Sequence, residues 1–266
     1  MVIVMKQVIA VYSETGGATK TTTAVSLAVC SALLGHATDL IDLDPRGAAT
    51  KWLGVTPAED WQHVGAILGN ADPIGWVNDL ALPSPWEEVP GLRVVPSSRS
   101  LSNREAVVED HSDVRLRLAL DGTTAAVTIL DLPNRQGGPL IQNALTAATK
   151  VVYAAKLDED GLDGVDGAAM SVRRYRQHRV QLGAPVSLIE AGIIVGSVRE
   201  TVMTMDARRA LSELTKSYGE LVLDPLVPER VIVREARAAG RYYGFFDKGS
   251  VVHDAYLTLT RKVLDA

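Results

Sequence analysis

Short apolar runs alternate with longer amphipathic stretches along most of this chain. Runs typical of buried strands cover residues 7–12, 37–43, 92–96, 125–132, 151–155, 186–195 and 220–226. Helical patterns lie near residues 21–34, 101–120, 138–148, 165–182 and 201–217, and a last helix is expected at 250–264. Parallel strands joined by crossover helices produce this alternation. The sequence therefore predicts an α/β doubly wound fold, with a mainly parallel sheet covered by helices on both faces.

The composition is that of an ordinary folded protein. The chain has 266 residues, 47% of them apolar and 22% charged, and no repeat or linker interrupts it, so we expect one domain over residues 1–266. A single cysteine, Cys30, excludes an internal disulfide and a cysteine-based zinc site. No apolar run is long enough for a spanning helix, and no cleavable leader pattern begins the chain. These features predict a soluble, cytoplasmic protein with no membrane partner.

Residues 56–90 are the hardest part of the sequence to interpret. They hold three of the four tryptophans and five of the twelve prolines. Two interpretations stay open. The segment could be a variable insertion that forms a surface for a partner, or its tryptophans could seal a helix against the sheet edge.

Charge is unevenly distributed along the chain. The net charge is −5, but residues 1–170 hold 12 basic and 21 acidic side chains, whereas residues 171–266 hold 15 basic and 11 acidic ones. A polyanion would therefore meet the C-terminal part. The alternative is a solvated helix face that happens to be rich in arginine.

A glycine-rich loop with a lysine follows the first predicted strand, and reads Ser-Glu-Thr-Gly-Gly-Ala-Thr-Lys-Thr-Thr-Thr over residues 13–23. Gly16 and Gly17 allow the backbone to turn so that its N–H groups point at phosphate oxygens, and the start of the following helix adds unpaired N–H groups. Lys20 supplies a cation for the β- and γ-phosphates, and the Thr21 hydroxyl can ligate Mg²⁺. The loop thus predicts a phosphate-binding site.

Two further predicted strands end on carboxylates. The segment Leu-Ile-Asp-Leu-Asp-Pro-Arg-Gly at residues 40–47 places Asp44 there, and Thr-Ile-Leu-Asp-Leu-Pro at residues 128–133 places Asp131. Such carboxylates hold Mg²⁺ through water or orient a water at the γ-phosphate. Either aspartate alone could equally be a helix cap or a turn residue. Together with the loop, in this order, the three segments predict a site for ATP and Mg²⁺.

These segments resemble the ParA/MinD group of P-loop ATPases, whose "deviant" Walker A loop reads K-G-G-x-G-K-T-T. The small ParA partition proteins without an N-terminal helix-turn-helix are the most similar. The likeness covers nearly the whole chain outside residues 56–90. It rests on Thr-Gly-Gly-Ala-Thr-Lys-Thr-Thr, Asp-Leu-Asp-Pro-Arg-Gly-Ala-Ala-Thr, Leu-Asp-Leu-Pro, Leu-Val-Pro-Glu-Arg-Val, Arg-Glu-Ala and Ala-Tyr-Leu, at residues 15–22, 42–50, 130–133, 226–231, 234–236 and 255–257.

The resemblance implies a role for each matching position. Residues that would bind the nucleotide are Thr15, Gly16, Gly17, Ala18, Thr19, Lys20, Thr21 and Thr22, with Pro228 and Glu229 lining the adenine pocket largely through their backbone. The catalytic set would be Lys20, Asp44 and Asp131, in which Asp44 helps to position the attacking water. The metal would be served by Thr21, Asp44 and Asp131.

The resemblance also implies partners and a biological outcome. ParA proteins form homodimers around two ATP molecules, and the dimer binds DNA without sequence specificity. A ParB-like centromere-binding protein then stimulates hydrolysis, and a plasmid, phage or chromosome is segregated. The implied location is the cytoplasm, on the nucleoid.

The loop departs from the family pattern at two places. The signature lysine that reaches the partner subunit's phosphates is replaced by Thr15, which follows Glu14, and Thr19 occupies a glycine position. Loss of a cation at a transition state that gathers charge slows hydrolysis. Three explanations stay open: a weakened switch, a substitute cation such as Arg46 or Arg135, or a differently arranged dimer.

Non-specific DNA binding requires basic side chains displayed on one face. The candidates lie in the basic C-terminal part: Arg199, Arg208, Arg209, Arg234, Arg237, Arg241 and Lys248. The spacing of Arg234, Arg237 and Arg241 predicts that they share one helical face. The tract Arg173, Arg174, Arg176 and Arg179 is a second possibility, and ordinary surface arginines are the alternative to both.

Two other functions remain open from the sequence. Without the signature lysine the protein could be a non-hydrolysing ATP-binding regulator or adaptor, and a metabolic synthetase of the same superfamily is a third possibility. The five histidines show no metal-ligand spacing, and the last predicted helix lacks the basic amphipathic tip of a membrane anchor.

Overall fold

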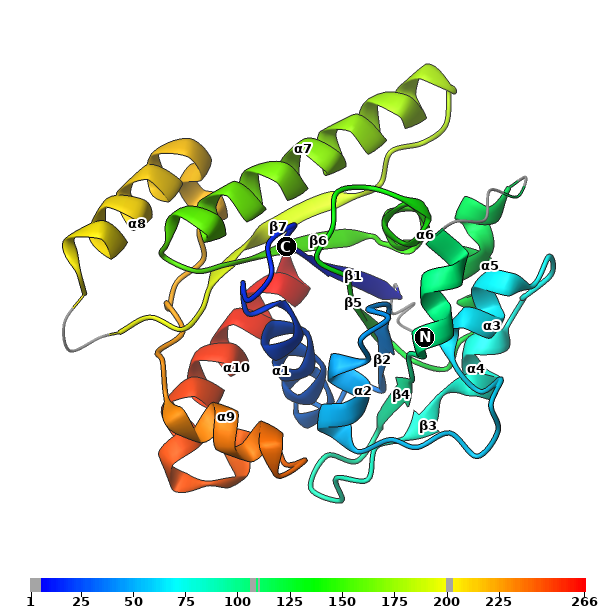
Figure 1. The fold of residues 1–266 in the computed structure, drawn as a ribbon, viewed down its shortest axis with the longest axis horizontal. Helices are drawn as coiled ribbons and strands as arrows, with labels where there is room; N and C mark the ends of the chain where they lie inside the picture. The colour runs from blue at the N-terminus through cyan, green and yellow to red at the C-terminus, as the bar shows by residue number, and fades with distance from the viewer. Residues whose placement is uncertain (1–5, 106–108, 110, 200–202) are drawn as a thin grey trace.

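A seven-stranded sheet forms the centre of the molecule (Figure 1). The computed structural model describes residues 6–105, 109, 111–199 and 203–266. The strand order is β3-β4-β2-β5-β1-β6-β7, and all neighbours are parallel except β3 and β4. The strands are β1 Gln7–Tyr12, β2 Thr38–Asp42, β3 Leu82–Pro83, β4 Leu92–Val95, β5 Val127–Asp131, β6 Lys150–Ala155 and β7 Ile189–Val195. The predicted doubly wound α/β fold is confirmed.

Helices cover both faces of the sheet, and each face has its own core (Figure 1). One face packs against α1 Lys20–Leu33, α2 Ala48–Leu53, α9 Val231–Ala238 and α10 Ser250–Asp265. The other packs against α3 Val64–Gly69, α4 Trp76–Leu80, α5 Arg115–Ala119, α6 Pro139–Ala147, α7 Glu159–Gln181 and α8 Met205–Tyr218. Strand β1 shows why both faces are buried: Val8, Ala10 and Tyr12 enter one core, and Ile9 and Val11 enter the other.

Two expected elements, a strand and a helix, do not form as the sequence predicted. The strand expected at residues 220–226 is instead a 3₁₀ turn, Gly219–Leu221, followed by one bridge between Ile193 and Val222. Pro225 has no N–H to donate to a sheet, so the pairing is interrupted between the Leu223 N–H, which donates to the Ile193 carbonyl, and the Val227 N–H, which donates to the Val195 carbonyl. The helix expected at 101–120 is divided into 3₁₀ segments, Arg99–Glu105 and Ser112–Val114, and α5; residues 106–108 and 110 lie outside the described residues.

Three helices differ in their limits from the prediction. Helix α7 begins at Glu159 because the Asp158 side chain caps it by accepting a hydrogen bond from the Gly161 N–H at 2.8 Å. Helix α8 begins at Met205, and residues 201–202 of the predicted helix lie outside the described residues. Helix α9 ends at Ala238, so Arg241 does not share a helical face with Arg234 and Arg237, and that prediction is wrong.

Residues 56–90 form α3, α4 and the edge strand β3, and their tryptophans have different environments. Trp86 is buried in one core, and its indole N–H donates to the Gly240 carbonyl at 2.8 Å. Trp76 packs partly buried against the other core, and Trp61 is exposed. Trp86 thereby ties this segment to the turn that follows α9.

Candidate functional site

The loop between β1 and α1 has the backbone geometry of an anion cradle. Gly17 has φ of 78° and Thr19 has φ of 63°, both in the left-handed region. Glycine adopts that region freely, whereas a β-branched residue is strained there. The Thr19 side chain does not cap α1, so the first N–H groups of this 14-residue helix face the pocket beside the loop.

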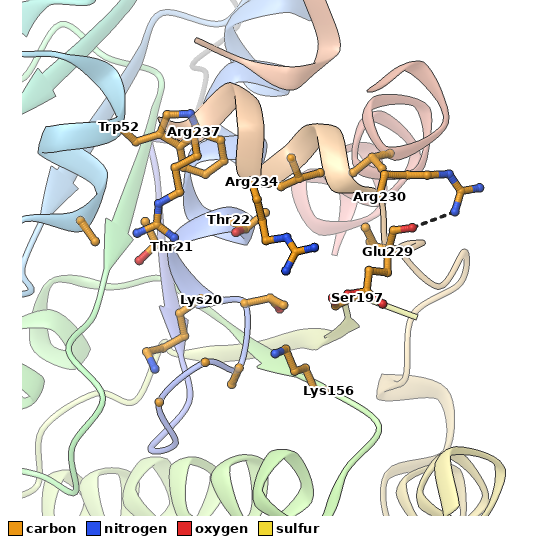
Figure 2. Close-up of a pocket in the computed structure, with 18 of the residues that line it drawn as sticks. Lys20, Thr21, Thr22, Trp52, Lys156, Ser197, Glu229, Arg230, Arg234 and Arg237 are labelled. Atoms are coloured by element: carbon orange, nitrogen blue, oxygen red, sulfur yellow. Dashed lines mark hydrogen bonds between the residues drawn. The ribbon is translucent and has the colours of Figure 1, made fainter. Parts of the chain in front are cut away.

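The loop forms one wall of a pocket of about 890 Å³. Helix α9 forms the opposite wall (Figure 2). The segments that follow β2, β5, β6 and β7 and residues of α2 and α10 also line the pocket. Predicted residues that the structure brings together there are Gly16, Gly17, Ala18, Thr19, Lys20, Thr21, Thr22, Asp44, Pro228 and Glu229. A mononucleotide fits a cavity of this size.

Lys20 lies at the base of the pocket and is only 8% exposed. Its Nζ donates a hydrogen bond to the Thr15 carbonyl at 2.8 Å. Burial lowers the pKa of Lys20 to about 8, although the carboxylates of Asp131 and Asp44 act in the opposite direction. The ammonium is therefore only partly stabilised in the nucleotide-free protein and gains from an anionic ligand.

Asp42 and Asp131 are paired in register on neighbouring strands beneath the pocket, and both are completely buried. Asp42 accepts hydrogen bonds from the Thr50 N–H and hydroxyl, each at 2.8 Å, and from the Asp44 N–H at 3.1 Å. Burial nevertheless raises the pKa of Asp42 to about 6. Asp42 is a site residue that the sequence analysis missed, although it stands in the same Asp-Leu-Asp segment as Asp44.

Neither carboxylate oxygen of Asp131 has a hydrogen-bond partner within 3.5 Å among the described residues. Burial, followed by repulsion from Asp42, raises the pKa of Asp131 well above its usual range, and the nearby Thr21 hydroxyl lowers it. A buried carboxylate without a partner is costly unless a cation or ordered water completes it. This orphaned group beside Thr21 fits Mg²⁺. The described residues contain no cluster of three acidic, histidine or cysteine ligands, so phosphate oxygens and water would supply most of the coordination.

The first half of the loop is docked against α7 and directed away from the pocket. The Glu14 carboxylate accepts from the Tyr12 hydroxyl at 3.1 Å and the Ser171 hydroxyl at 2.7 Å. The Thr15 hydroxyl donates to the Asp160 carbonyl at 2.8 Å. Thr15 is thus absent from the pocket wall of described residues, unlike Gly16 to Thr22, and only its carbonyl meets Lys20.

The segment before α9 that lines the pocket is held by main-chain bonds to the segment that follows β7. The Glu229 N–H donates to the Val198 carbonyl at 2.7 Å, and the Val198 N–H donates to the Val227 carbonyl at 3.0 Å. Pro228 is fixed between them on the pocket wall. Further wall residues that the sequence analysis did not name are Trp52, Lys156, Ser197, Val233 and Ala238. They come from four separate segments, and no local pattern marks them.

The predicted DNA-binding residues are all exposed but do not form one set. Arg234 and Arg237 extend from α9 into the pocket rather than onto an outer face (Figure 2). Arg208 and Arg209 lie on α8, and Arg241 forms an ion pair with Glu88. Arg199 pairs with Glu229 at 2.9 Å, and Lys248 lies in the 3₁₀ turn before α10.

A comparison with known families agrees with this geometry. The model of a family described as an AAA domain, AAA_31, matches residues 6–182. The chain belongs to this family of ParA/MinD-type P-loop ATPases. The predicted membership of the ParA/MinD group is therefore confirmed.

Curated relatives of this AAA-domain protein match almost end to end. The sporulation initiation inhibitor protein Soj of Bacillus subtilis is 29% identical over 97% of this chain and 98% of its own length. The chromosome-partitioning ATPase Soj of Thermus thermophilus is 31% identical over 96% of this chain and 94% of its own.

Solved structures share the same fold. Apo McdA from Cyanothece superimposes with a TM-score of 0.82 at 18% identity, covering 97% of this chain and 99% of that one. The cobyrinic acid a,c-diamide synthase of Mycobacterium smegmatis, bound to ADP and magnesium, gives a TM-score of 0.74 at 26% identity, covering 97% and 93%. In the described part of our chain, no helix combines the length and apolar character needed to cross a membrane.

Proposed function

We propose that this protein is a ParA-like partition ATPase that binds ATP with Mg²⁺, dimerises, and binds DNA without sequence specificity. The observation that carries the proposal is the pocket lined by Lys20 and Thr21 at the start of α1, with the orphaned Asp131 buried beneath it. Near end-to-end similarity to Soj proteins supports a role in segregating DNA.

The pocket residues have defined tasks in this proposal. The cradle N–H groups and Lys20 bind the β- and γ-phosphates. Thr21 and Asp131 would hold Mg²⁺, which would supply charge neutralisation at the phosphates. Asp44 orients a water toward the γ-phosphate. The water oxygen bonds to the γ-phosphorus as the bond to the β,γ-bridging oxygen breaks, and ADP leaves with that electron pair. Phosphate departs with the water oxygen, and the released proton passes to solvent.

Pro228 and Glu229 border the adenine end of the pocket, where their main chain is already fixed by the bonds to Val198. This rigidity lets backbone groups select the base. Thr15 to Thr22 take the phosphates, with Thr15 contributing through its carbonyl bond to Lys20 rather than through its side chain.

Dimerisation, DNA binding and a ParB-like partner complete the proposed cycle. Exposed arginines on α8, together with Arg199, Arg241 and Lys248, supply positive charge in an otherwise acidic protein. Because the monomer is acidic, we infer that dimerisation completes the DNA-binding patch. The protein would then reside in the cytoplasm on the nucleoid, and would serve a plasmid, a phage or the chromosome.

Sedimentation with DNA, run beside an ATPase assay, tests the proposal. We expect retention on DNA of any sequence with ATP but not with ADP or without nucleotide, and faster phosphate release when DNA and a ParB-like centromere-binding protein are added. Equal retention on DNA with ATP, with ADP and without nucleotide would contradict ATP-dependent DNA binding. Saturable ATP binding without any phosphate release would favour the alternative, a non-hydrolysing ATP-binding regulator.

A further inference from the structure

Lys156, which lies outside the phosphate-binding loop, approaches the loop whose signature lysine is replaced by Thr15. Lys156 directly follows β6, and its side chain extends toward the glycines of the loop (Figure 2). Its Nζ lies 4.0 Å from the position that a Cβ on Gly17 would occupy. Lys156 therefore approaches the glycine end of the cradle, while Lys20 occupies the opposite, buried end.

The charge of Lys156 is not engaged by a protein carboxylate. Among the described residues, no Asp or Glu oxygen lies within 4.0 Å of its Nζ, although Asp158 and Glu229 share a smaller adjoining pocket with it. Its side chain is half-buried. A cation held at a pocket without a partner favours an anionic ligand there.

The other cations near the cradle are less suited to this place. Lys51 donates its ammonium to the Arg46 carbonyl at 2.6 Å, and Arg237 lies over the Trp52 ring at 5.7 Å. Arg46 lines the pocket on the side of Asp44. The Arg135 guanidinium packs by Gly138, 3.5 Å from where a Cβ would be, and does not line the pocket of described residues.

Position 15 cannot supply the charge from its present place. The Thr15 side chain is bonded to α7, and the position of a Cβ on Gly164 lies only 2.5 Å from its hydroxyl oxygen. Glycine at 164 thus lets the loop approach the helix closely and keeps residue 15 turned away from the cavity.

We propose that Lys156 compensates for the missing lysine of the loop from within its own subunit's pocket, where it binds the γ-phosphate end of ATP. This inference rests on the proposed function. As negative charge gathers on the phosphoryl oxygens, the Lys156 ammonium stabilises it and so accelerates hydrolysis.

Substitution at position 156 tests the inference. We expect Lys156→Ala to lower kcat for ATP hydrolysis by about 100-fold or more, and to weaken binding of a non-hydrolysable ATP analogue about tenfold while leaving ADP binding within about threefold. Lys156→Arg should restore most of the rate. Adding Thr15→Lys to Lys156→Ala should recover little of it, because residue 15 is docked on α7 and turned away from the cavity. Arg46→Ala and Arg234→Ala are matched controls, since both remove a cation from the same pocket.

The result that would overturn the inference is a Lys156→Ala protein with wild-type hydrolysis and an unchanged preference for the ATP analogue over ADP. Equal losses in Lys156→Ala and Arg46→Ala, with no recovery in Lys156→Arg, would also overturn it. If the wild-type protein binds ATP without hydrolysing it, the proposed ATPase fails, but the ratio of analogue to ADP affinity still decides the role of Lys156.

Discussion

At the scale of single residues, Lys20 gives the site a dependence on pH. Burial lowers its pKa to about 8 in the nucleotide-free protein, and ATP binds the charged form. Affinity should be constant below about pH 7 and fall by about tenfold for each unit above pH 8, until the higher pKa of the bound state is reached. Calorimetry across this range, in buffers of different ionisation enthalpy, should detect up to about one proton taken up per ATP. Lys20→Arg, which does not titrate there, should bind with little pH dependence; a flat wild-type profile would contradict the prediction.

We expect the buried Asp131 carboxylate to lower the stability of the nucleotide-free protein while supporting the binding of ATP and Mg²⁺. Its carboxylate is buried beside Asp42 without a hydrogen bond among the described residues. Asp131→Asn should therefore raise the free energy of unfolding of the nucleotide-free protein by about 1–2 kcal/mol at neutral pH, and should reduce the thermal stabilisation given by ATP and Mg²⁺. The pKa of Asp131 is higher in the folded protein than in the unfolded chain. Its carboxylate therefore destabilises the wild-type protein only at pH values above the pKa of Asp131 in the unfolded chain. The difference in unfolding free energy should vanish near pH 4.

Denaturant unfolding of Asp131→Asn and Asp39→Asn measures this contrast. Asp39 is equally buried, but Arg93 donates to its two oxygens at 2.8 and 2.9 Å. Removing that paired charge should destabilise the protein. A loss of stability in both variants would show that Asp131 is compensated in the nucleotide-free state.

At the scale of elements, the docking of the loop on α7 depends on small residues. A Cβ on Gly167 would lie 2.2 Å from Oε2 of Glu14. Gly167→Ala should displace Glu14 from its bond with Ser171. Because the end of the Glu14 side chain can move, the lost hydrogen bond should exceed the usual gain of Gly→Ala in a helix only slightly, and lower the free energy of unfolding by at most about 1 kcal/mol. Arg174→Ala, on an exposed position of the same helix, should change it by less than about 0.5 kcal/mol. Chemical denaturation measures both, and a more stable Gly167→Ala would contradict the docking.

Most elements of the fold were predictable because local patterns suffice for them. The apolar run at residues 7–12 and the helix after the loop are formed as expected, since both sheet faces are covered and Lys20 begins α1. Residues 220–226 look like a strand by composition, but a 3₁₀ turn and Pro225 leave them with one bridge. That outcome depends on the chain's path after α8, which periodicity does not encode.

The candidate site was predictable only where motifs are contiguous. The loop residues, Asp44, Pro228 and Glu229 lie together in the pocket, as predicted. Lys156 and Trp52 were missed because tertiary packing alone brings them there. Asp131 supports the pocket from below and is buried rather than on its wall. Arg234 and Arg237 follow the predicted spacing but face the pocket, because α9 folds over it.

At the scale of the whole molecule, the DNA-binding surface can be tested by its dependence on salt. Arg208 and Arg209 are exposed on α8, and among the described residues only Arg209 of the two has a carboxylate partner, Glu213 at 3.3 Å. The double variant Arg208→Ala/Arg209→Ala should weaken ATP-dependent DNA binding and reduce the slope of log affinity against log salt by about 2 per protomer, without changing ATP affinity. Arg173→Ala/Arg174→Ala on α7 tests the second arginine tract. If only this variant loses DNA binding, the DNA-binding surface lies on α7 rather than on α8.

The central claim is that residues 16–21 form an anion cradle that binds the triphosphate of ATP. Calorimetric titration of the purified protein with ATP and Mg²⁺ tests it most directly. We predict saturable binding in about the 1 µM–1 mM range for wild type. Binding should be lost in Lys20→Ala, which removes the buried cation from the cradle. Absence of any ATP uptake by the folded wild-type protein, or equal uptake by Lys20→Ala, would contradict the account.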